Sequence, residues 1–271
     1  MLEEGPPLPR LIVTADDMGL SATWDEAIVR AWGRGVVTSA SIVTTGRSYR
    51  DTIRRIVRED IDHGVHLDLL DGAPLSPVGE ISSLVDERGR FHPLRALLLR
   101  FASGRVRTDE VELEWSRQIE RALGDGLRPT HLNGHYHLHL LPGVFGVTVR
   151  LASRFGMGWV RVPDEAPWLA LRVPGSRPAR VAKTTVLWML SRAQVSSASR
   201  PEVGHVGCRA MVPGGRGWLE SLQSIRGDVT EVLCHPGQSD GETVALLSAE
   251  LRNTIDRRFR PTSFRDLHGA S

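Results

Sequence analysis

The clearest feature of this chain is the stretch Leu11-Ile12-Val13-Thr14-Ala15-Asp16-Asp17, in which an apolar, β-branched run ends in two adjacent carboxylates. Three further apolar runs also end in residues that can bind a metal ion. They lead into His66, into the histidine-rich stretch 131–139, and into His235. Residues at the carboxyl ends of parallel strands meet on one face of an α/β sheet or barrel, where such folds bind ligands. The sequence therefore predicts a divalent-metal site on that face.

Strands and helices are expected to alternate, because apolar, β-branched runs are followed by segments of helical periodicity. This order is typical of βα units and of a parallel sheet. We expect strands at 11–15, 36–43, 64–69, 131–139, 159–162, 204–208 and 229–234. We expect helices after the first strand, at 49–57, 108–123, 144–155 and 246–259, and one within 163–201. No internal repeat or clear linker interrupts the pattern, so one domain over residues 1–271 is predicted, with a core of about 10–267.

The segment 70–107 is long for a connection and begins with several prolines and glycines. Loops of this length are usually functional or carry their own short structure. We therefore expect a lid or an insertion over the site. This segment and the region 163–201 are the expected sources of specificity, because loops at the rim of a barrel shape its pocket.

Composition excludes several classes of protein. The chain has 271 residues and 41% apolar content, enough for a large core. The formal net charge is only +2 and Lys183 is the single lysine, so the scattered arginines predict no nucleic-acid partner. Cys208 and Cys234 match neither a disulfide framework nor a zinc finger, which favours a reducing, cytoplasmic location. We expect no signal peptide and no transmembrane segment, since no run approaches roughly 20 apolar residues.

Asp16 and Asp17 are expected to have different roles. Neighbouring residues on a strand point to opposite faces. The two carboxylates would therefore converge poorly on one glycosidic bond, which needs facing groups about 5 Å apart or more. A pair in which one carboxylate binds metal and the other acts as a base fits better. The alternative is a structural turn or helix cap, because aspartate often ends strands.

Histidines supply the other candidate ligands. His66, in Gly64-Val65-His66-Leu67, is either a ligand or a hydrogen-bonded core residue. The stretch 131–139 is more specific, because alternate residues of an extended chain share one face. Its histidines are His131, His135, His137 and His139. Imidazole is the commonest neutral metal ligand, but not all four can bind one ion, and some would orient substrate or other ligands. A surface turn with adventitious metal affinity is the alternative.

Three more candidates follow later apolar runs. His235, in His235-Pro236-Gly237, can act as a general acid or base, or it can be a structural residue before a turn. Arg161 and Glu165 flank Val162-Pro163-Asp164. These two side chains can form an ion pair or hold a catalytic group.

Six motifs occur in one order: Ala15-Asp16-Asp17-Met18-Gly19-Leu20-Ser21, Gly35-Val36-Val37-Thr38-Ser39-Ala40-Ser41, Gly64-Val65-His66-Leu67, Thr130-His131-Leu132-Asn133-Gly134-His135-Tyr136-His137-Leu138-His139, Arg161-Val162-Pro163-Asp164-Glu165 and Glu231-Val232-Leu233-Cys234-His235-Pro236-Gly237. In this order and spacing they resemble the YdjC-like family of carbohydrate deacetylases, from about residue 11 to residue 267. The resemblance implies a single-domain irregular (β/α) barrel of the α/β class. Its parallel strands would carry a metal site at their C-terminal ends.

The resemblance also implies an activity, the metal-dependent removal of acetyl from an N-acetylated amino sugar. It implies Asp17, His66 and His135 as ligands of one divalent ion, zinc or magnesium. It implies Asp16 as the catalytic base and suggests His235 as the acid. Contacts with the substrate are expected from six other polar or aromatic residues of the motifs, which are His131, Tyr136, His137, His139, Arg161 and Glu165.

One departure from the family pattern falls inside the site. Asn133 stands where the family often has aspartate, so it cannot orient a histidine by charge. Two other functions are open. A phosphodiesterase or phosphatase with a two-metal centre would need more carboxylates than we can place, and a non-catalytic sugar- or metal-binding protein would need no base. The sequence does not identify the sugar, and a homodimer is expected only from the frequency of dimers among soluble proteins.

Overall fold

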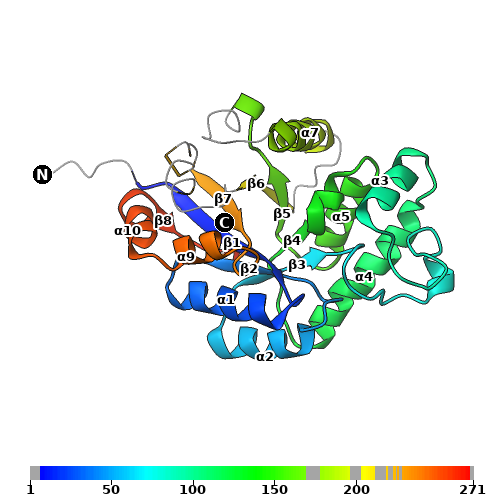
Figure 1. Cartoon of the computed structure of the whole chain (residues 1–271), viewed down its shortest axis with the longest axis horizontal. Helices are drawn as coiled ribbons and strands as arrows, with labels where there is room; N and C mark the ends of the chain where they lie inside the picture. Colours follow the sequence, from blue (N-terminus) through cyan, green and yellow to red (C-terminus); the bar gives the residue numbers. More distant parts are fainter. Residues whose placement is uncertain are drawn as a thin grey trace, which may run out of the picture.

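Parallel strands form a closed barrel in the computed structural model, which describes residues 7–168, 178–195, 203–210, 218, 222–223, 225 and 228–268. The strands are β1 (Arg10–Met18), β2 (Ser39–Ile42), β3 (His63–Leu67), β4 (His131–Gly134), β5 (Trp159–Pro163), β6 (Gly204–Ala210), β7 (Val229–Cys234) and β8 (Arg260–Pro261). All neighbouring strands pair in parallel, and β1 pairs with both β2 and β7. The first seven strands therefore close into a barrel (Figure 1), which confirms the predicted fold class.

Helices surround the barrel (Figure 1). They are α1 (Ala22–Gly33), α2 (Tyr49–Glu59), η1 (Val78–Glu80), α3 (Leu94–Ala102), α4 (Thr108–Gly124), η2 (His135–Leu140), α5 (Val144–Arg154), α7 (Pro178–Val195), α9 (Asp240–Leu246), α10 (Ala249–Arg258) and α11 (Phe264–His268). In the described part of the chain, no helix has both the length and the hydropathy that a membrane span requires.

Strand β1 shows how the barrel is packed, because its alternate side chains enter two different apolar clusters. Leu11, Val13 and Ala15 belong to the large cluster that includes the surrounding helices. Ile12 packs instead with side chains of β6 and α11. Successive strand residues point to opposite faces. This alternation gives Asp16 the same direction as Ile12, toward the barrel interior.

The histidine-rich stretch does not form one extended strand, so that prediction is wrong. Strand β4 ends at Gly134, and residues 135–140 form the 3-10 helix η2. Within η2, Tyr136 and His137 have left-handed backbone conformations, with φ of 52° and 59°. Such values are uncommon for residues other than glycine, and they turn the chain sharply. The four imidazoles consequently do not share one face.

The predicted insertion carries η1 and α3 and is fastened to α4 by buried polar side chains. The carboxylate of Glu114 accepts hydrogen bonds from the backbone nitrogens of Leu75 and Ser76 at 3.1 and 2.9 Å. The amide of Gln118 bonds both the backbone nitrogen and the backbone oxygen of Asp68, at 2.9 and 2.7 Å. These contacts satisfy backbone groups that would otherwise be buried without partners. They fix the start of the insertion beside the carboxyl end of β3.

Candidate metal centre and active site

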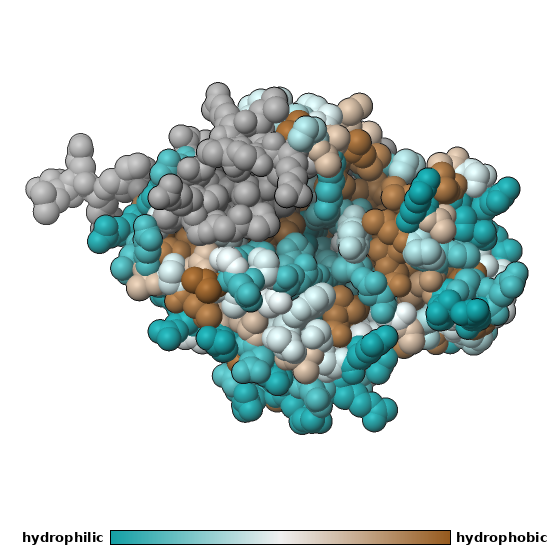
Figure 2. All heavy atoms as spheres, in the orientation of Figure 1, coloured by the Kyte–Doolittle hydropathy of each residue, from teal (hydrophilic) through white to brown (hydrophobic). Residues whose placement is uncertain are grey.

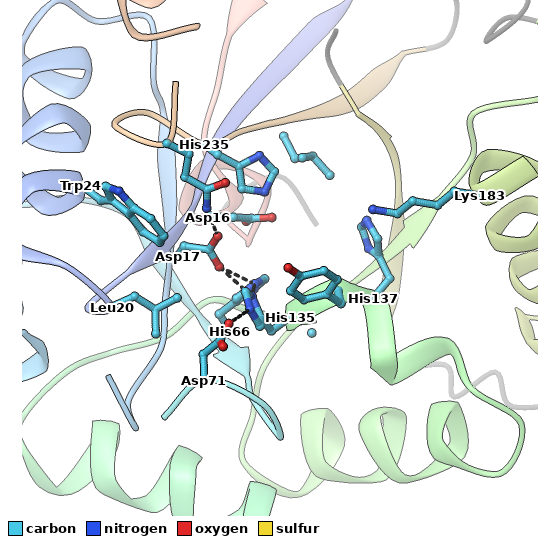
Figure 3. Close-up of a pocket in the computed structure, with 14 residues that line it drawn as sticks. Asp16, Asp17, Leu20, Trp24, His66, Asp71, His135, His137, Lys183 and His235 are labelled. Carbon is cyan, nitrogen blue, oxygen red and sulfur yellow. Dashed lines mark hydrogen bonds and ion pairs between the residues drawn. The ribbon is translucent and has the colours of Figure 1, made fainter. Parts of the chain in front are cut away.

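Asp17, His66 and His135 come together at the carboxyl ends of β1, β3 and β4. The Oδ1 atom of Asp17 lies 2.8 Å from His135 Nδ1 and 3.3 Å from His66 Nε2. All three side chains are buried, and one potential ligand atom from each lies within 4.8 Å of the others. Figure 3 shows the three side chains pointing toward one another. Within the described ranges, no other group of His, Cys, Asp and Glu has this spacing.

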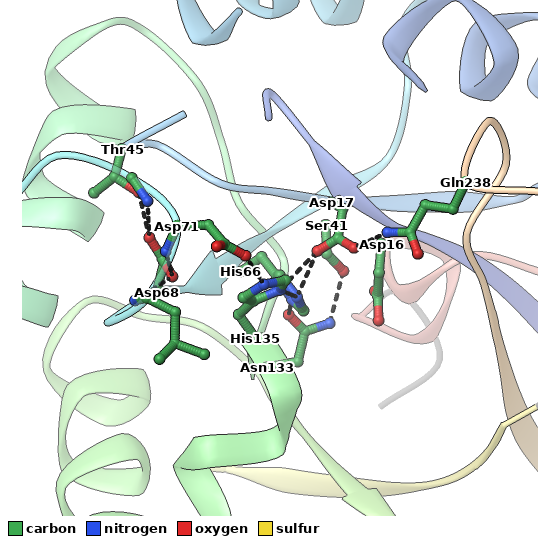
Figure 4. A network of polar contacts seen from close by, with 12 residues as sticks. Asp16, Asp17, Ser41, Thr45, His66, Asp68, Asp71, Asn133, His135 and Gln238 are labelled. Atoms are coloured by element: carbon green, nitrogen blue, oxygen red, sulfur yellow. Dashed lines mark hydrogen bonds and ion pairs between the residues drawn. The ribbon is translucent and has the colours of Figure 1, made fainter. Parts of the chain in front are cut away.

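The backbone at Asp17 explains how two adjacent carboxylates serve one pocket. Asp17 has a left-handed φ of 68°, and the pairing of β1 with β2 shifts register between Ala15 and Met18. Irregularities of this kind re-aim side chains and are common beside active sites. Asp16 keeps the inward direction of the strand, whereas Asp17 turns toward the two histidines (Figure 4).

Asp16 is held by a buried arginine. Two nitrogens of Arg161 donate to the two oxygens of Asp16, at 2.5 and 2.8 Å. Arg161 also donates twice to Glu231 Oε1, at 3.0 and 2.6 Å. Burial by itself raises the pKa of Asp16, but neighbouring positive charge, above all that of Arg161, holds this pKa well below its usual range. Asp16 is therefore an ionised, oriented carboxylate at neutral pH, as a proton acceptor must be.

Each histidine of the group has a partner on its other ring nitrogen (Figure 4). His135 Nε2 donates to Asp71 Oδ2 at 2.7 Å, and His66 Nδ1 lies 2.6 Å from Asn133 Oδ1. Burial opposes protonation of His135, but its contacts with the carboxylates of Asp17 and Asp71 raise its pKa to about 10. Such partners fix the ring orientation of metal-binding histidines. The arrangement thus leaves one nitrogen of each ring directed at Asp17.

The group fits a divalent cation. Two imidazoles and one carboxylate suit zinc, and other divalent ions also accept this set. The Oδ1 atom of Asp17 is buried without a hydrogen bond of standard geometry, although the two ring nitrogens face it. Burial raises the pKa of Asp17, but contacts with His135 and His66 lower it well below the usual range. A cation between these atoms would satisfy the carboxylate that the protein leaves ionised there.

The group lies in the wall of a pocket of about 300 Å³ (Figure 3). The predicted site residues that line it are Asp16, Asp17, His66, His135, Tyr136, His137 and His235. Lining residues that were not predicted include Leu20, Trp24, Asp71, Lys183 and Gln238. Asp71 and Gln238 each follow a strand end by four residues, so their position near a strand end is the signal that could have found them. Figure 2 shows a central hollow in one face of the molecule, with polar side chains around it.

Four residues predicted to contact substrate do not line this pocket. His131 is completely buried, and its ring stacks on Phe264 with 3.9 Å between the ring centroids. His139 is also completely buried and donates from Nε2 to the backbone oxygen of Arg161 at 3.0 Å. The side chains of Arg161 and Glu165 are buried outside the lining. We therefore correct the prediction that these four residues contact a substrate in the pocket.

The fold and the site define an α/β-barrel protein with a candidate site for one divalent cation at the carboxyl ends of its strands. The family model described as YdjC-like protein matches residues 10–260. The chain belongs to this family, which confirms the resemblance seen in the sequence.

Similar relatives carry the name carbohydrate deacetylase. The relative from Mus musculus is 30% identical over 248 residues, which cover 85% of this chain and 79% of that protein. The relative from Homo sapiens is 31% identical over 251 residues, which cover 85% of this chain and 76% of that protein.

Two solved structures share the fold. A protein of Enterococcus faecalis V583, provisionally assigned to cellobiose-phosphate cleavage, is 24% identical with a TM-score of 0.72, over 96% of this chain and 99% of its own. The peptidoglycan deacetylase PdaC of Bacillus subtilis is 14% identical with a TM-score of 0.50, over 98% of this chain and 93% of its own. At these identities the likeness supports the barrel architecture alone.

Proposed function

We propose that this protein is a metal-dependent carbohydrate deacetylase that removes the acetyl group from an N-acetylated amino sugar. The observation that carries the proposal is that the two adjacent carboxylates at the end of β1 have different partners. Asp17 faces two histidines, and Asp16 accepts two hydrogen bonds from Arg161. Family membership and the relatives named carbohydrate deacetylase support the same activity.

Asp17, His66 and His135 are the residues that would hold the ion. A divalent ion in such a site polarises a carbonyl group and lowers the pKa of water. The ligand set suits zinc, and magnesium is the second candidate. Asp71 and Asn133 would orient the two imidazoles through their other ring nitrogens.

Asp16 would act as the general base. It lines the pocket, is ionised at neutral pH, and is held in one orientation by Arg161. As water adds to the acetyl carbonyl carbon, the carboxylate of Asp16 takes the proton that the water loses. His235 lines the same pocket and would give a proton to the amide nitrogen as the carbon–nitrogen bond breaks. The products are acetic acid and the amine, which at neutral pH become acetate and an ammonium group. The starting state returns when Asp16 gives up the proton it took and His235 regains the one it gave, so atoms and protons balance.

Aromatic side chains in the pocket wall suit a sugar ring. Tyr136 is 52% exposed, and its ring meets that of His135 edge-on with 4.7 Å between the centroids. Trp24 lines the pocket from α1 (Figure 3). Such faces are suited to stacking on apolar surface while their polar groups remain in water. We also propose His137, which lines the pocket beside them, as a contact for the sugar.

The phosphodiesterase alternative is less well supported. A two-metal centre needs additional carboxylates close to the first ion. In the described part of the chain, the single metal-competent group contains one carboxylate, that of Asp17. Cys208 and Cys234 are buried free thiols, and we propose a reducing, cytoplasmic setting on that basis. The homodimer remains a prediction.

The test is acetate release from diacetylchitobiose and from a panel of N-acetylated glycosides. Metal-stripped protein is compared with protein given zinc, magnesium or cobalt. Asp16→Asn should reduce kcat by about 10²- to 10⁴-fold, the contribution of a positioned base, while metal binding is retained. The matched control is Asp51→Asn, which changes an exposed carboxylate on α2. Metal-independent acetate release, or full activity of Asp16→Asn, would contradict the proposal.

A further inference from the structure

The side-chain amide of Asn133 lies between His66 on one side and Arg161 and Ser41 on the other, and its single oxygen can face only one side at a time. One side faces His66 Nδ1 at 2.6 Å. The other side faces Ser41 Oγ at 2.6 Å and two guanidinium nitrogens of Arg161 at 2.8 and 3.2 Å. All four side chains are buried, so water cannot replace a missing partner. Figure 4 shows the amide between His66 and Ser41.

The first demand comes from His66. Its Nε2 atom is the one that faces Asp17, at 3.3 Å. A neutral imidazole that binds a cation through Nε2 carries its proton on Nδ1, and a buried N–H needs an acceptor. The oxygen of Asn133 is the acceptor within reach of that nitrogen.

The second demand comes from Arg161, whose guanidinium can only donate. When the oxygen of Asn133 faces His66, its amide nitrogen faces the guanidinium, and two donors meet. When the amide is turned, its oxygen accepts from Arg161 and Ser41, and its nitrogen donates to His66 Nδ1. An amide has one oxygen, so no single orientation satisfies both Arg161 and a metal-binding His66.

We propose that Asn133 is a positioning residue that weakens cation binding in this protein, because its amide must turn from Arg161 to His66 when the ion binds. A carboxylate at position 133 would accept from both sides at once and remove the conflict. This inference rests on the metal site of the proposed function and is independent of which bond is hydrolysed.

The test measures zinc and magnesium affinity by calorimetry on the full-length, metal-stripped protein. Asn133→Asp should bind the ion about ten- to a hundredfold more tightly, the range by which the partners of metal ligands alter affinity. The substitution also adds a negative charge, which attracts any cation. Lys183→Gln is the charge control, because it makes the pocket more negative by the same unit without touching His66.

Nitrogen NMR of the His66 ring tests the wild type alone, which keeps the inference testable if Asn133→Asp does not fold. The proton of His66 should sit on Nε2 in the metal-free wild type and on Nδ1 after diamagnetic zinc or magnesium is added. In metal-free Asn133→Asp it should already sit on Nδ1. A wild-type His66 with its proton on Nδ1 in both states would overturn the inference.

The remaining outcomes separate the inference from the proposed function. An affinity gain of Asn133→Asp no larger than that of Lys183→Gln overturns the inference, while a metal-dependent deacetylase activity would still stand. Failure of the wild type to bind either ion overturns both the inference and the cofactor of the proposed function. The inference is supported if Asn133→Asp binds the ion more tightly, Lys183→Gln does not, and the proton of His66 moves from Nε2 to Nδ1 as expected.

Discussion

The guanidinium of Arg161 donates hydrogen bonds to both oxygens of Asp16 across the barrel interior, although the two residues are 145 positions apart in the chain. Arg161 is completely buried and does not line the pocket. The charge and the orientation of the proposed base are therefore set by a side chain that a substrate in the pocket does not reach. Planar guanidinium groups make this paired contact, whereas an ammonium group is a single point charge.

Replacing Arg161 by lysine should lower kcat more than it lowers metal affinity. The charge is retained but the paired contact with Asp16 is lost, so the carboxylate is held less firmly. We expect kcat to fall by about ten- to a hundredfold, part of the 10²- to 10⁴-fold that a positioned base contributes. Steady-state kinetics and calorimetric metal titration of the same samples give both values.

The control for this prediction is Arg150→Lys, which changes a surface ion pair with Glu112. Surface pairs contribute little to stability, so this variant should behave as the wild type does. Unchanged kcat for Arg161→Lys, or an equal loss for both variants, would show that the paired contact has no role in the reaction.

The parallel α/β architecture and the core of the site could be predicted because apolar runs and the residues at their ends are visible in the sequence. Asp17, His66 and His135 each stand at or just after the end of an apolar run, and parallel strands bring such ends together. Periodicity and β-branched composition are local signals, so they survive in the sequence without knowledge of tertiary contacts. The closure of β1 onto both β2 and β7 does not follow from parallel strands, which also form open sheets, and was implied only by the family resemblance.

The errors arise where the backbone leaves regular geometry. His137 and Tyr136 have left-handed conformations in a stretch that carries no glycine at those positions, so the sequence pattern gave no reason to end the strand at Gly134. The sequence left open whether Arg161 forms an ion pair or holds a catalytic group, and it did not identify the partners Asp16 and Glu231, because these lie on distant strands. Hydrogen bonds between distant residues produce no periodic pattern in the sequence, whereas the apolar faces of helices and strands do.

Asp71 is predicted to support the metal site through His135. Its carboxylate accepts from His135 Nε2 at 2.7 Å, which keeps Nδ1 directed at Asp17. Asp71→Asn should therefore weaken zinc or magnesium affinity by about tenfold or more. Calorimetry on metal-stripped protein measures this effect without reference to turnover.

The companion variant for Asp71 is Glu80→Gln, an exposed acid of the same insertion that pairs with Arg117. It should leave metal affinity unchanged. If Asp71→Asn instead raises KM and leaves metal affinity intact, Asp71 contacts the substrate and does not position the imidazole.

The insertion should lose its local order when Glu114 is neutralised. Its carboxylate accepts from the backbone nitrogens of Leu75 and Ser76 and is completely buried. Hydrogen bonds to a charged acceptor contribute about 1.5 to 3 kcal/mol each. We expect Glu114→Gln to lower the free energy of unfolding by about 1 to 3 kcal/mol and to speed amide hydrogen exchange at both nitrogens. The matched control is Glu120→Gln on the same helix, which is exposed and should change neither quantity.

His139 should make the metal-free protein sensitive to acid. Burial lowers its pKa to about 3, although a hydrogen bond to the backbone oxygen of Arg161 raises it slightly. The unfolded chain binds this proton near pH 6.5, so stability is lost as the pH falls from about 6.5 toward 3. At pH 5 the loss of unfolding free energy that this residue causes is about 2 kcal/mol.

The variant His139→Gln can keep the hydrogen bond to the backbone oxygen of Arg161 but cannot titrate. Between pH 7 and pH 5 the wild type should therefore lose about 2 kcal/mol more unfolding free energy than His139→Gln loses. Urea unfolding at both values measures the difference, and equal losses for the two proteins would show that His139 is protonated in the folded state.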